Sequence, residues 1–263
     1  MELGLAGRVA IVGGGSKGIG RAAAMMLAAE GARVVIAARG QAALTDAAEA
    51  IRDATGAEVL SVECDMAVYE DIKRLVQRTV ETFGAIDIVV NNAGGPPPGT
   101  FEHHDDEAWV KAVDQNLMSV VRLTREALPY LKASDQARVI NVTSTAVKEP
   151  IDGLILSNSV RLGTTGLAKT LSKELGRYGI TVNNVGPGLT LTDRIRPVLE
   201  AQAVAEGRTF DEQKQLRARQ IPLGRVGEAE DVAAMIVFLA SRQARQISGQ
   251  TILVDGGATG SVF

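Results

Sequence analysis

The sequence has little of several features, and each shortage excludes a class of protein. A single cysteine, Cys64, stands among 263 residues, so no disulfide can form within the chain and no cysteine cluster can bind a metal. The net charge of −3 gives no reason to expect nucleic acid or an anionic membrane as a partner. No apolar run is long enough to span a bilayer, and residues 1–5 lack the character of a signal peptide. We therefore expect a soluble cytoplasmic protein without a membrane, nucleic-acid or metal partner.

What the chain does contain is a strand, a glycine cluster and a helix near its start. Residues 9–12 are apolar and mostly β-branched, glycines follow between 13 and 20, and residues 22–27 are strong helix formers. Glycines let backbone N–H groups approach a diphosphate, and the helix N-terminus adds partial positive charge. A glycine cluster alone is also typical of a flexible turn, but the flanking strand and helix favour a nucleotide-binding site.

Strands and helices alternate along the rest of the chain. Further strands are expected at 32–39, 59–65, 86–91, 138–144, 180–185 and 251–255, and helices at 41–54, 71–83, from about 106 to 132, up to about 178 and at 228–240. This alternation predicts a parallel sheet covered on both faces, in one domain spanning 1–263. The polar segment at about 193–220, between a strand end and a helix, is expected to form a substrate lid.

Several motifs occur in the order and at the spacing of the classical short-chain dehydrogenase/reductases, which the chain resembles over nearly its whole length. They are Gly14-x-x-x-Gly18-Ile19-Gly20, Asn91-Asn92-Ala93-Gly94, Asn116, Ser144, Pro187-Gly188 and Val254-Asp255-Gly256-Gly257. The resemblance implies a doubly wound, Rossmann-type α/β fold: seven parallel strands, helices on both faces, and a dinucleotide across the carboxyl ends of the strands. Residues 250–257 resemble the strand through which such proteins form tetramers, so a homotetramer or homodimer is expected.

The resemblance also implies which residues contact the cofactor. Those around the diphosphate and the adenosine ribose are Gly14, Ser16, Lys17, Gly18, Ile19 and Gly20, with Gly13 where a threonine is usual. Those bracketing the adenine are Asp65 and Met66, and those lining the adenosine–ribose side of the cleft are Asn92, Ala93 and Gly94. Those forming the turn that faces the nicotinamide are Pro187, Gly188, Leu189 and Thr192.

The end of the second strand bears on the choice of cofactor. A cofactor with a free 2′-hydroxyl favours a carboxylate there, but this chain has Ala38 followed by Arg39, and Lys17 lies in the glycine loop. Two cations without an acid favour the 2′-phosphate of NADP over NAD, although both could be ordinary surface charges.

The catalytic pattern of the family is broken in this chain. The family has a tyrosine thirteen residues after its serine, which protonates the carbonyl oxygen, and a lysine four residues later, which holds the nicotinamide ribose and lowers the tyrosine pKa. Counting from Ser144 reaches Ser157 and Arg161, and the match of residues 166–169 to the family fixes this register independently. Asn116 matches the asparagine that holds a water beside the lysine. The catalytic candidates are thus Ser144, Ser157, Arg161 and Asn116.

With these residues in place of the tyrosine and the lysine, we expect weaker acid catalysis and a retained positive charge. Serine is shorter than tyrosine and a far weaker acid, whereas arginine can hold ribose hydroxyls but does not relay protons. Ser144 and Arg161 could stabilise an oxyanion while water or the substrate supplies the proton. The remaining candidates are interpreted more simply as solvated residues. They are the pair Tyr69 and Lys73, expected on the adenine side, and the loop residues Lys148, His103, His104 and Asp152. Arg194 and Arg196 of the lid are interpreted in the same way, although they could otherwise meet an anionic substrate.

Three functions remain open. The first is an NADP-dependent oxidoreductase of the short-chain type that acts on a small carbonyl or alcohol substrate with an atypical active site. The second is a lyase or isomerase on the same fold, and the third is an NADP-binding sensor or scaffold without catalysis. We rank the first highest because polar residues that form hydrogen bonds replace both missing catalytic groups.

Overall fold

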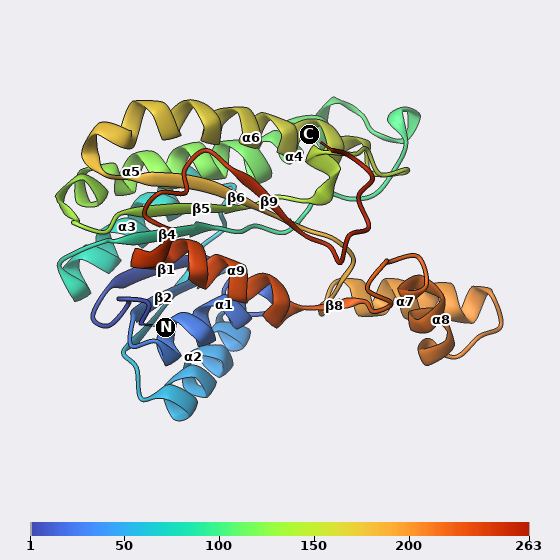
Figure 1. The fold of residues 1–263 in the computed structure, drawn as a ribbon, viewed down its shortest axis with the longest axis horizontal. Helices are drawn as coiled ribbons and strands as arrows, with labels where there is room; N and C mark the ends of the chain where they lie inside the picture. The colour runs from blue at the N-terminus through green and yellow to red at the C-terminus, as the bar shows by residue number, and fades with distance from the viewer. Residues whose placement is uncertain (1, 263) are drawn as a thin grey trace.

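A parallel sheet of seven strands forms the centre of the computed structural model, which describes residues 2–262 (Figure 1). In spatial order its strands are β3 (Val59–Glu63), β2 (Arg33–Ala38), β1 (Val9–Gly13), β4 (Ile88–Asn91), β5 (Arg138–Val142), β6 (Thr181–Pro187) and β9 (Thr251–Val254). Every neighbouring pair is parallel. The doubly wound parallel sheet expected from the sequence is therefore confirmed.

The order of the strands reverses between β1 and β4. The chain runs outward from β1 through β2 to β3 and then returns to pair β4 with the other side of β1. In open α/β sheets, ligands bind beyond the carboxyl ends of the strands at such a switch point. Both strands are fully buried there, so the residues that follow them, from Gly14 and from Asn92 onward, line the edge of the sheet.

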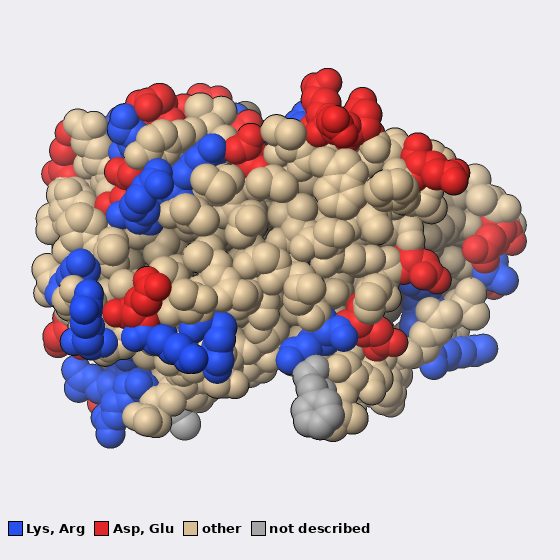
Figure 2. All heavy atoms as spheres, turned by 90° about the horizontal axis from the view of Figure 1, so that it is seen from above, with Lys and Arg blue, Asp and Glu red and all other residues tan. Residues whose placement is uncertain are grey.

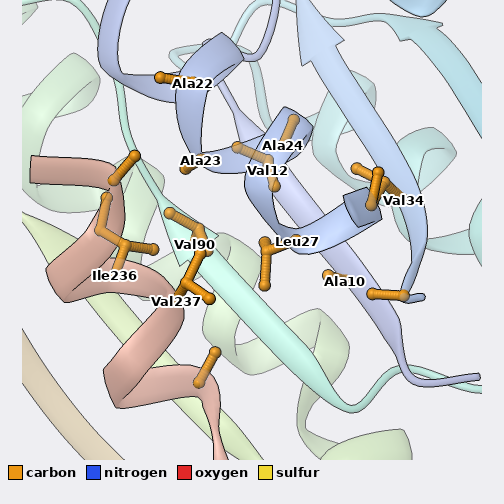
Figure 3. Packing of buried hydrophobic residues seen from close by; sticks show 14 of the residues in the cluster. Ala10, Val12, Ala22, Ala23, Ala24, Leu27, Val34, Val90, Ile236 and Val237 are labelled. Atoms are coloured by element: carbon orange, nitrogen blue, oxygen red, sulfur yellow. The ribbon is translucent and has the colours of Figure 1, made fainter. Parts of the chain in front are cut away.

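Helices cover both faces of the sheet because successive strand side chains point to opposite sides. On one face lie α1 (Gly18–Ala29), α2 (Gln41–Thr55) and α9 (Ala229–Ala240), and on the other α3 (Tyr69–Phe83), α5 (Ser119–Ala133) and α6 (Ile155–Leu175). Figure 3 shows the hydrophobic core on the face covered by α1, α2 and α9, where Leu27 of α1 and Val237 of α9 lie beside Val90 of β4. Complete burial of Leu27 contributes about 2 kcal/mol to folding.

The helix expected from about 106 to 132 is interrupted. The structure has α4 (Asp106–Val113), a π-helical turn at Asp114–Met118, and then α5. Asp105 caps α4 by accepting a hydrogen bond from the N–H of Ala108 at 2.9 Å. Such π turns insert an extra residue into a helix, and they are frequent at functional sites. Here the turn contains Asn116, one of the catalytic candidates.

The segment at about 193–220, which is expected to form a lid and is called the lid below, contains two short helices, α7 (Ile195–Ala205) and α8 (Phe210–Ala218), between β7 (Thr190–Leu191) and β8 (Gly227–Glu228). Figure 1 shows α7 and α8 projecting beyond one end of the sheet. Both helices lie within the segment at about 193–220 that the sequence places between a strand end and a helix. Over residues 2–262, no helix combines the length and the apolar character needed to cross a bilayer.

Candidate functional site

The glycine loop between β1 and α1 is shaped to let a ligand approach its backbone. Gly14 and Gly18 have φ angles of 59° and 50°, in the left-handed region that favours glycine. A Cβ added to Gly14 would lie 2.8 Å from the side-chain nitrogen of Asn92, and one added to Gly20 would lie 2.3 Å from the carbonyl oxygen of Gly14. The loop thus folds tightly against Asn92 and leads into the N-terminus of α1. This cradle fits the diphosphate of a dinucleotide.

The cations predicted to select the cofactor stand at the end of β2 and in the glycine loop. Arg39 follows the last residue of β2 and is exposed, as is Lys17. Within residues 2–262 neither side chain forms an ion pair or a hydrogen bond with another residue. Their charges are therefore free to meet an anionic group, such as a 2′-phosphate.

Ser144 lies just beyond the carboxyl end of β5. It is half-buried and begins a 3₁₀ turn, with its Oγ accepting a hydrogen bond from the N–H of Ala146 at 3.1 Å. Because this contact uses only a lone pair of the hydroxyl, the hydroxyl hydrogen remains available to donate to a substrate oxygen.

Ser157 and Arg161 lie one turn apart on α6, so they share a helix face, and both are buried. Nη1 of Arg161 donates to the carbonyl oxygen of Val142, the last residue of β5, at 2.9 Å. This bond brings the guanidinium to the strand that carries Ser144 at its end. The sheet and α6 thus place two catalytic candidates at one edge.

Arg161 is a buried cation without an acid. Within residues 2–262, its side chain forms no hydrogen bond or ion pair with a carboxylate. Burial and, to a smaller extent, the charge of Arg194 together lower the pKa of Arg161 to about 10. The guanidinium therefore keeps its proton at neutral pH and presents an uncompensated positive charge to the cleft.

A cavity of about 10 Å³, with both polar and apolar side chains in its wall, joins residues that the sequence assigned to separate motifs. Its lining residues are Met66, Asn91, Asn92, Ala93, Asn116, Ser119, Val120, Val142 and Arg161. The side-chain oxygens of Asn91 and Asn116 are buried and have no hydrogen-bond partner in the part of the chain that the structure describes. Buried polar atoms of this kind need a donor, so the cavity wall offers acceptors next to the Arg161 donors.

The other polar groups of Asn116 are already engaged. Its side-chain nitrogen donates to the carbonyl oxygen of Ala112 at 3.2 Å, and its own carbonyl oxygen accepts from the hydroxyl of Thr164 at 3.0 Å. The side-chain oxygen, by contrast, has no partner within residues 2–262 and can accept from a further group. Asn116 thus faces the cavity through an acceptor.

The start of the lid contacts the glycine loop. A Cβ on Gly18 would lie 3.3 Å from Cβ of Thr192, and Oδ2 of Asp193 accepts a hydrogen bond from the N–H of Gly18 at 3.2 Å. The carboxylate thereby takes the place at the α1 N-terminus where a phosphate is expected. Sequence analysis did not identify Asp193, because nothing in its spacing shows that the lid returns to this loop.

Replacing Asp193 by asparagine is expected to tighten binding of NADPH. The amide removes a negative charge beside the diphosphate position, and a charge at a helix N-terminus is worth about 0.3–1 kcal/mol, which corresponds to about two- to fivefold in the dissociation constant. Fluorescence titration of both proteins with NADPH measures the change. Weaker binding by the variant would instead assign the carboxylate to cofactor contact.

Several candidates lie outside the site. The hydroxyl of Tyr69 donates to Glu126 at 2.7 Å, which ties α3 to α5 and leaves the Tyr69–Lys73 pair as a surface feature. Lys148, His103 and Asp152 are exposed. Nε2 of His104 is buried against the backbone of Gly99, without a hydrogen-bond partner in residues 2–262.

Arg194 is exposed, as expected from the sequence, but it also makes a contact that the sequence did not indicate. Its Nη2 donates to the carbonyl oxygen of Pro96 at 2.9 Å, and a Cβ on Gly95 would lie 2.5 Å from its Nη1. Its guanidinium therefore crosses from the lid to the loop after β4. In the sequence, Gly95, which leaves room for this guanidinium, was the only residue that could have indicated the contact.

Comparisons with known proteins agree with this architecture. A family model described as "Enoyl-(Acyl carrier protein) reductase" matches residues 14–259. The 3-oxoacyl-[acyl-carrier-protein] reductase FabG of Escherichia coli is 34% identical over 251 residues, which cover 95% of this chain and 97% of the relative.

Two solved structures are similar over almost their full length. L-sorbose reductase from Gluconobacter frateurii, complexed with NADPH and L-sorbose, is 32% identical with a TM-score of 0.97, and the match covers 100% of both chains. An NADPH-bound short-chain oxidoreductase from Pseudomonas aeruginosa, described as containing an atypical catalytic center, is 31% identical with a TM-score of 0.92, covering 99% of this chain and 100% of the other.

Proposed function

This chain belongs to the short-chain dehydrogenase/reductase family, and we propose that it is an NADPH-dependent reductase of carbonyl compounds with an atypical active site. The observation that carries the proposal is the glycine cradle at the switch point of the sheet, flanked by the free cations Lys17 and Arg39. The NADPH complexes of two structural relatives support the same cofactor. A bound NADPH would supply the hydride.

The residues of this chain would hold the carbonyl oxygen rather than protonate it. The hydroxyl of Ser144 donates to that oxygen, because its acceptor side is occupied by the N–H of Ala146. Arg161 uses one N–H for Val142 and retains others for ribose hydroxyls and for the negative charge that develops on the oxygen. Ser157 is too weak an acid to be the donor, so the proton comes from water or from the substrate.

Activity with a panel of carbonyl compounds tests this function. NADPH oxidation should accompany reduction of at least one class, and Ser144→Ala should lower kcat/KM by about tenfold, because one neutral hydrogen bond to the reacting oxygen is lost. Turnover that is unaffected by Ser144→Ala would contradict the site. Product formation without cofactor oxidation would favour a lyase or isomerase, and full NADPH affinity without any turnover would favour a sensor.

Arg39→Asp is expected to reverse the preference between cofactors. Arg39 is proposed to bind the 2′-phosphate, and a charged hydrogen bond is worth about 1.5–3 kcal/mol, so the variant should bind NADPH about 10- to 100-fold more weakly. The introduced carboxylate should at the same time improve NAD binding by accepting from the 2′-hydroxyl. Titration of both proteins with both cofactors checks this. Tighter binding of NAD than of NADP by the parent would refute the assignment.

We also propose that the chain forms a homotetramer or a homodimer. β9 is an edge strand whose four residues are only partly buried, so residues 250–257 are free to contact another copy. Figure 2, which views the side of α5 and α6, shows a broad central area without charged side chains. The exposed Val110 of α4 and Leu162 of α6 are apolar. Light scattering of the purified protein measures its mass in solution, which distinguishes a monomer from a dimer or a tetramer.

A further inference from the structure

Two arginines from different elements contact the backbone at the end of β5 and in the loop after β4. Arg161 comes from α6 and bonds to the end of β5, and Arg194 comes from the lid and bonds to Pro96 in the loop after β4. Each has only a carbonyl oxygen as its hydrogen-bond acceptor within residues 2–262. Arg161 lines the cavity together with Ala93, and the guanidinium of Arg194 lies against Gly95 and Pro96, two and three residues further along the same loop. In agreement with this arrangement, the charge of Arg194 helps to lower the pKa of Arg161.

Arg161 is a buried cation, Arg194 is an exposed one, and neither forms an ion pair within residues 2–262, so an anion between them would be stabilised by both. Burying an unpaired charge is costly, and the cost is recovered only when an opposite charge enters the site. The nearest acid in sequence, Asp193, is turned toward the N–H of Gly18 instead. Arg196 in the same lid differs from Arg161 and Arg194 in having an acidic partner, since it pairs with Glu200 at 3.7 Å and stacks on Phe210.

We propose that Arg161 and Arg194 bind a carboxylate of the substrate, so that the enzyme reduces carbonyl compounds that also carry an acid group. This inference rests on the proposed reductase function. Planar guanidinium groups match a carboxylate with paired N–H donors. Ser157, one turn from Arg161 on α6, is shorter than a tyrosine by about an aromatic ring, so it occupies less of this region than a tyrosine would.

The position of the pair favours the substrate over the cofactor as the source of the anion. The cofactor phosphates are expected at the glycine loop and at Arg39, which follow β1 and β2. Arg161 instead contacts the end of β5, and Arg194 contacts the loop after β4, on the side that carries Ser144. An anion held there lies close to the reacting carbonyl, which indicates 2-oxo or 3-oxo acids.

Calorimetric titration of the NADP⁺-loaded protein tests the inference without turnover, because cofactor and probes are both oxidised. The probes are 2-oxobutanoate and 3-oxobutanoate, each compared with its neutral amide. At least one acid should bind about tenfold or more tightly than its amide, in line with the strength of charged hydrogen bonds. Arg194→Gln should reduce this ratio to less than about threefold, and the matched variant Arg196→Gln should preserve it.

Each other outcome overturns the inference in an identifiable way. Equal binding of acids and amides, no binding of either, or an unchanged ratio in Arg194→Gln shows that no carboxylate site exists there. Loss of NADP⁺ affinity in Arg194→Gln assigns the arginine to the cofactor instead. If the acids bind selectively but no carbonyl compound is reduced with NADPH, the proposed reductase function fails while the anion site stands.

Discussion

Replacing Arg161 by methionine should lower kcat/KM for carbonyl reduction by about 10²–10³-fold, the effect expected for removing one preorganised group that stabilises a developing oxyanion. The same change should leave the melting temperature unchanged or raise it. Arg161 is buried without a carboxylate, and replacing a buried charge by an apolar side chain of similar size is often neutral or stabilising. Steady-state kinetics and thermal unfolding, measured on one preparation, check both parts.

The variant Arg161→Lys serves as the control for charge. Lysine keeps the cation but lacks the planar fork, so it should recover part of the lost activity. Activity of the methionine variant within about twofold of the parent would remove Arg161 from the site. A large fall in melting temperature together with lost activity would assign Arg161 a structural role only.

The sheet could be predicted because its strands differ clearly from their surroundings. The strands are buried on both faces, so each appears as a short, mostly apolar, β-branched run between turns. The interruption at Asp114–Met118 could not be predicted, because one inserted residue hardly changes the apolar spacing of the long helix around it. The ends of the strands were also less certain, and Ser144 and Asp65 lie in the loops after strands rather than in them.

The site was predictable where spacing fixes a residue to a strand end. Met66, Asn92, Asn116 and Arg161 were proposed from separate motifs, and the structure brings all four to one cavity. The role of Arg194 was not predictable, since the direction of a long side chain depends on the path of the lid and on the space at Gly95. Sequence spacing carries no information about such a path, and the neighbouring Arg196 does remain on the surface.

Introducing tyrosine at residue 157 together with lysine at 161 should raise kcat for a neutral ketone by about 10²-fold, the lower end of what a positioned general acid contributes. The two residues lie one turn apart on α6, so the new pair adopts the spacing that the family uses. Lysine is needed with the tyrosine because its ammonium can lower the tyrosine pKa and relay a proton, which arginine does not do.

The pH profile distinguishes a new acid from a better fit. In the parent, Arg161 has a pKa of about 10, and Ser144, Ser157 and Asn116 do not titrate, so kcat should be flat from about pH 6.5 to 9. In the double variant kcat should fall as pH rises, because the tyrosine loses the proton it must donate. The matched variant with phenylalanine at 157 and lysine at 161 should lack both the gain and this fall. An equal gain with phenylalanine would show that ring packing, rather than proton donation, limits the parent enzyme.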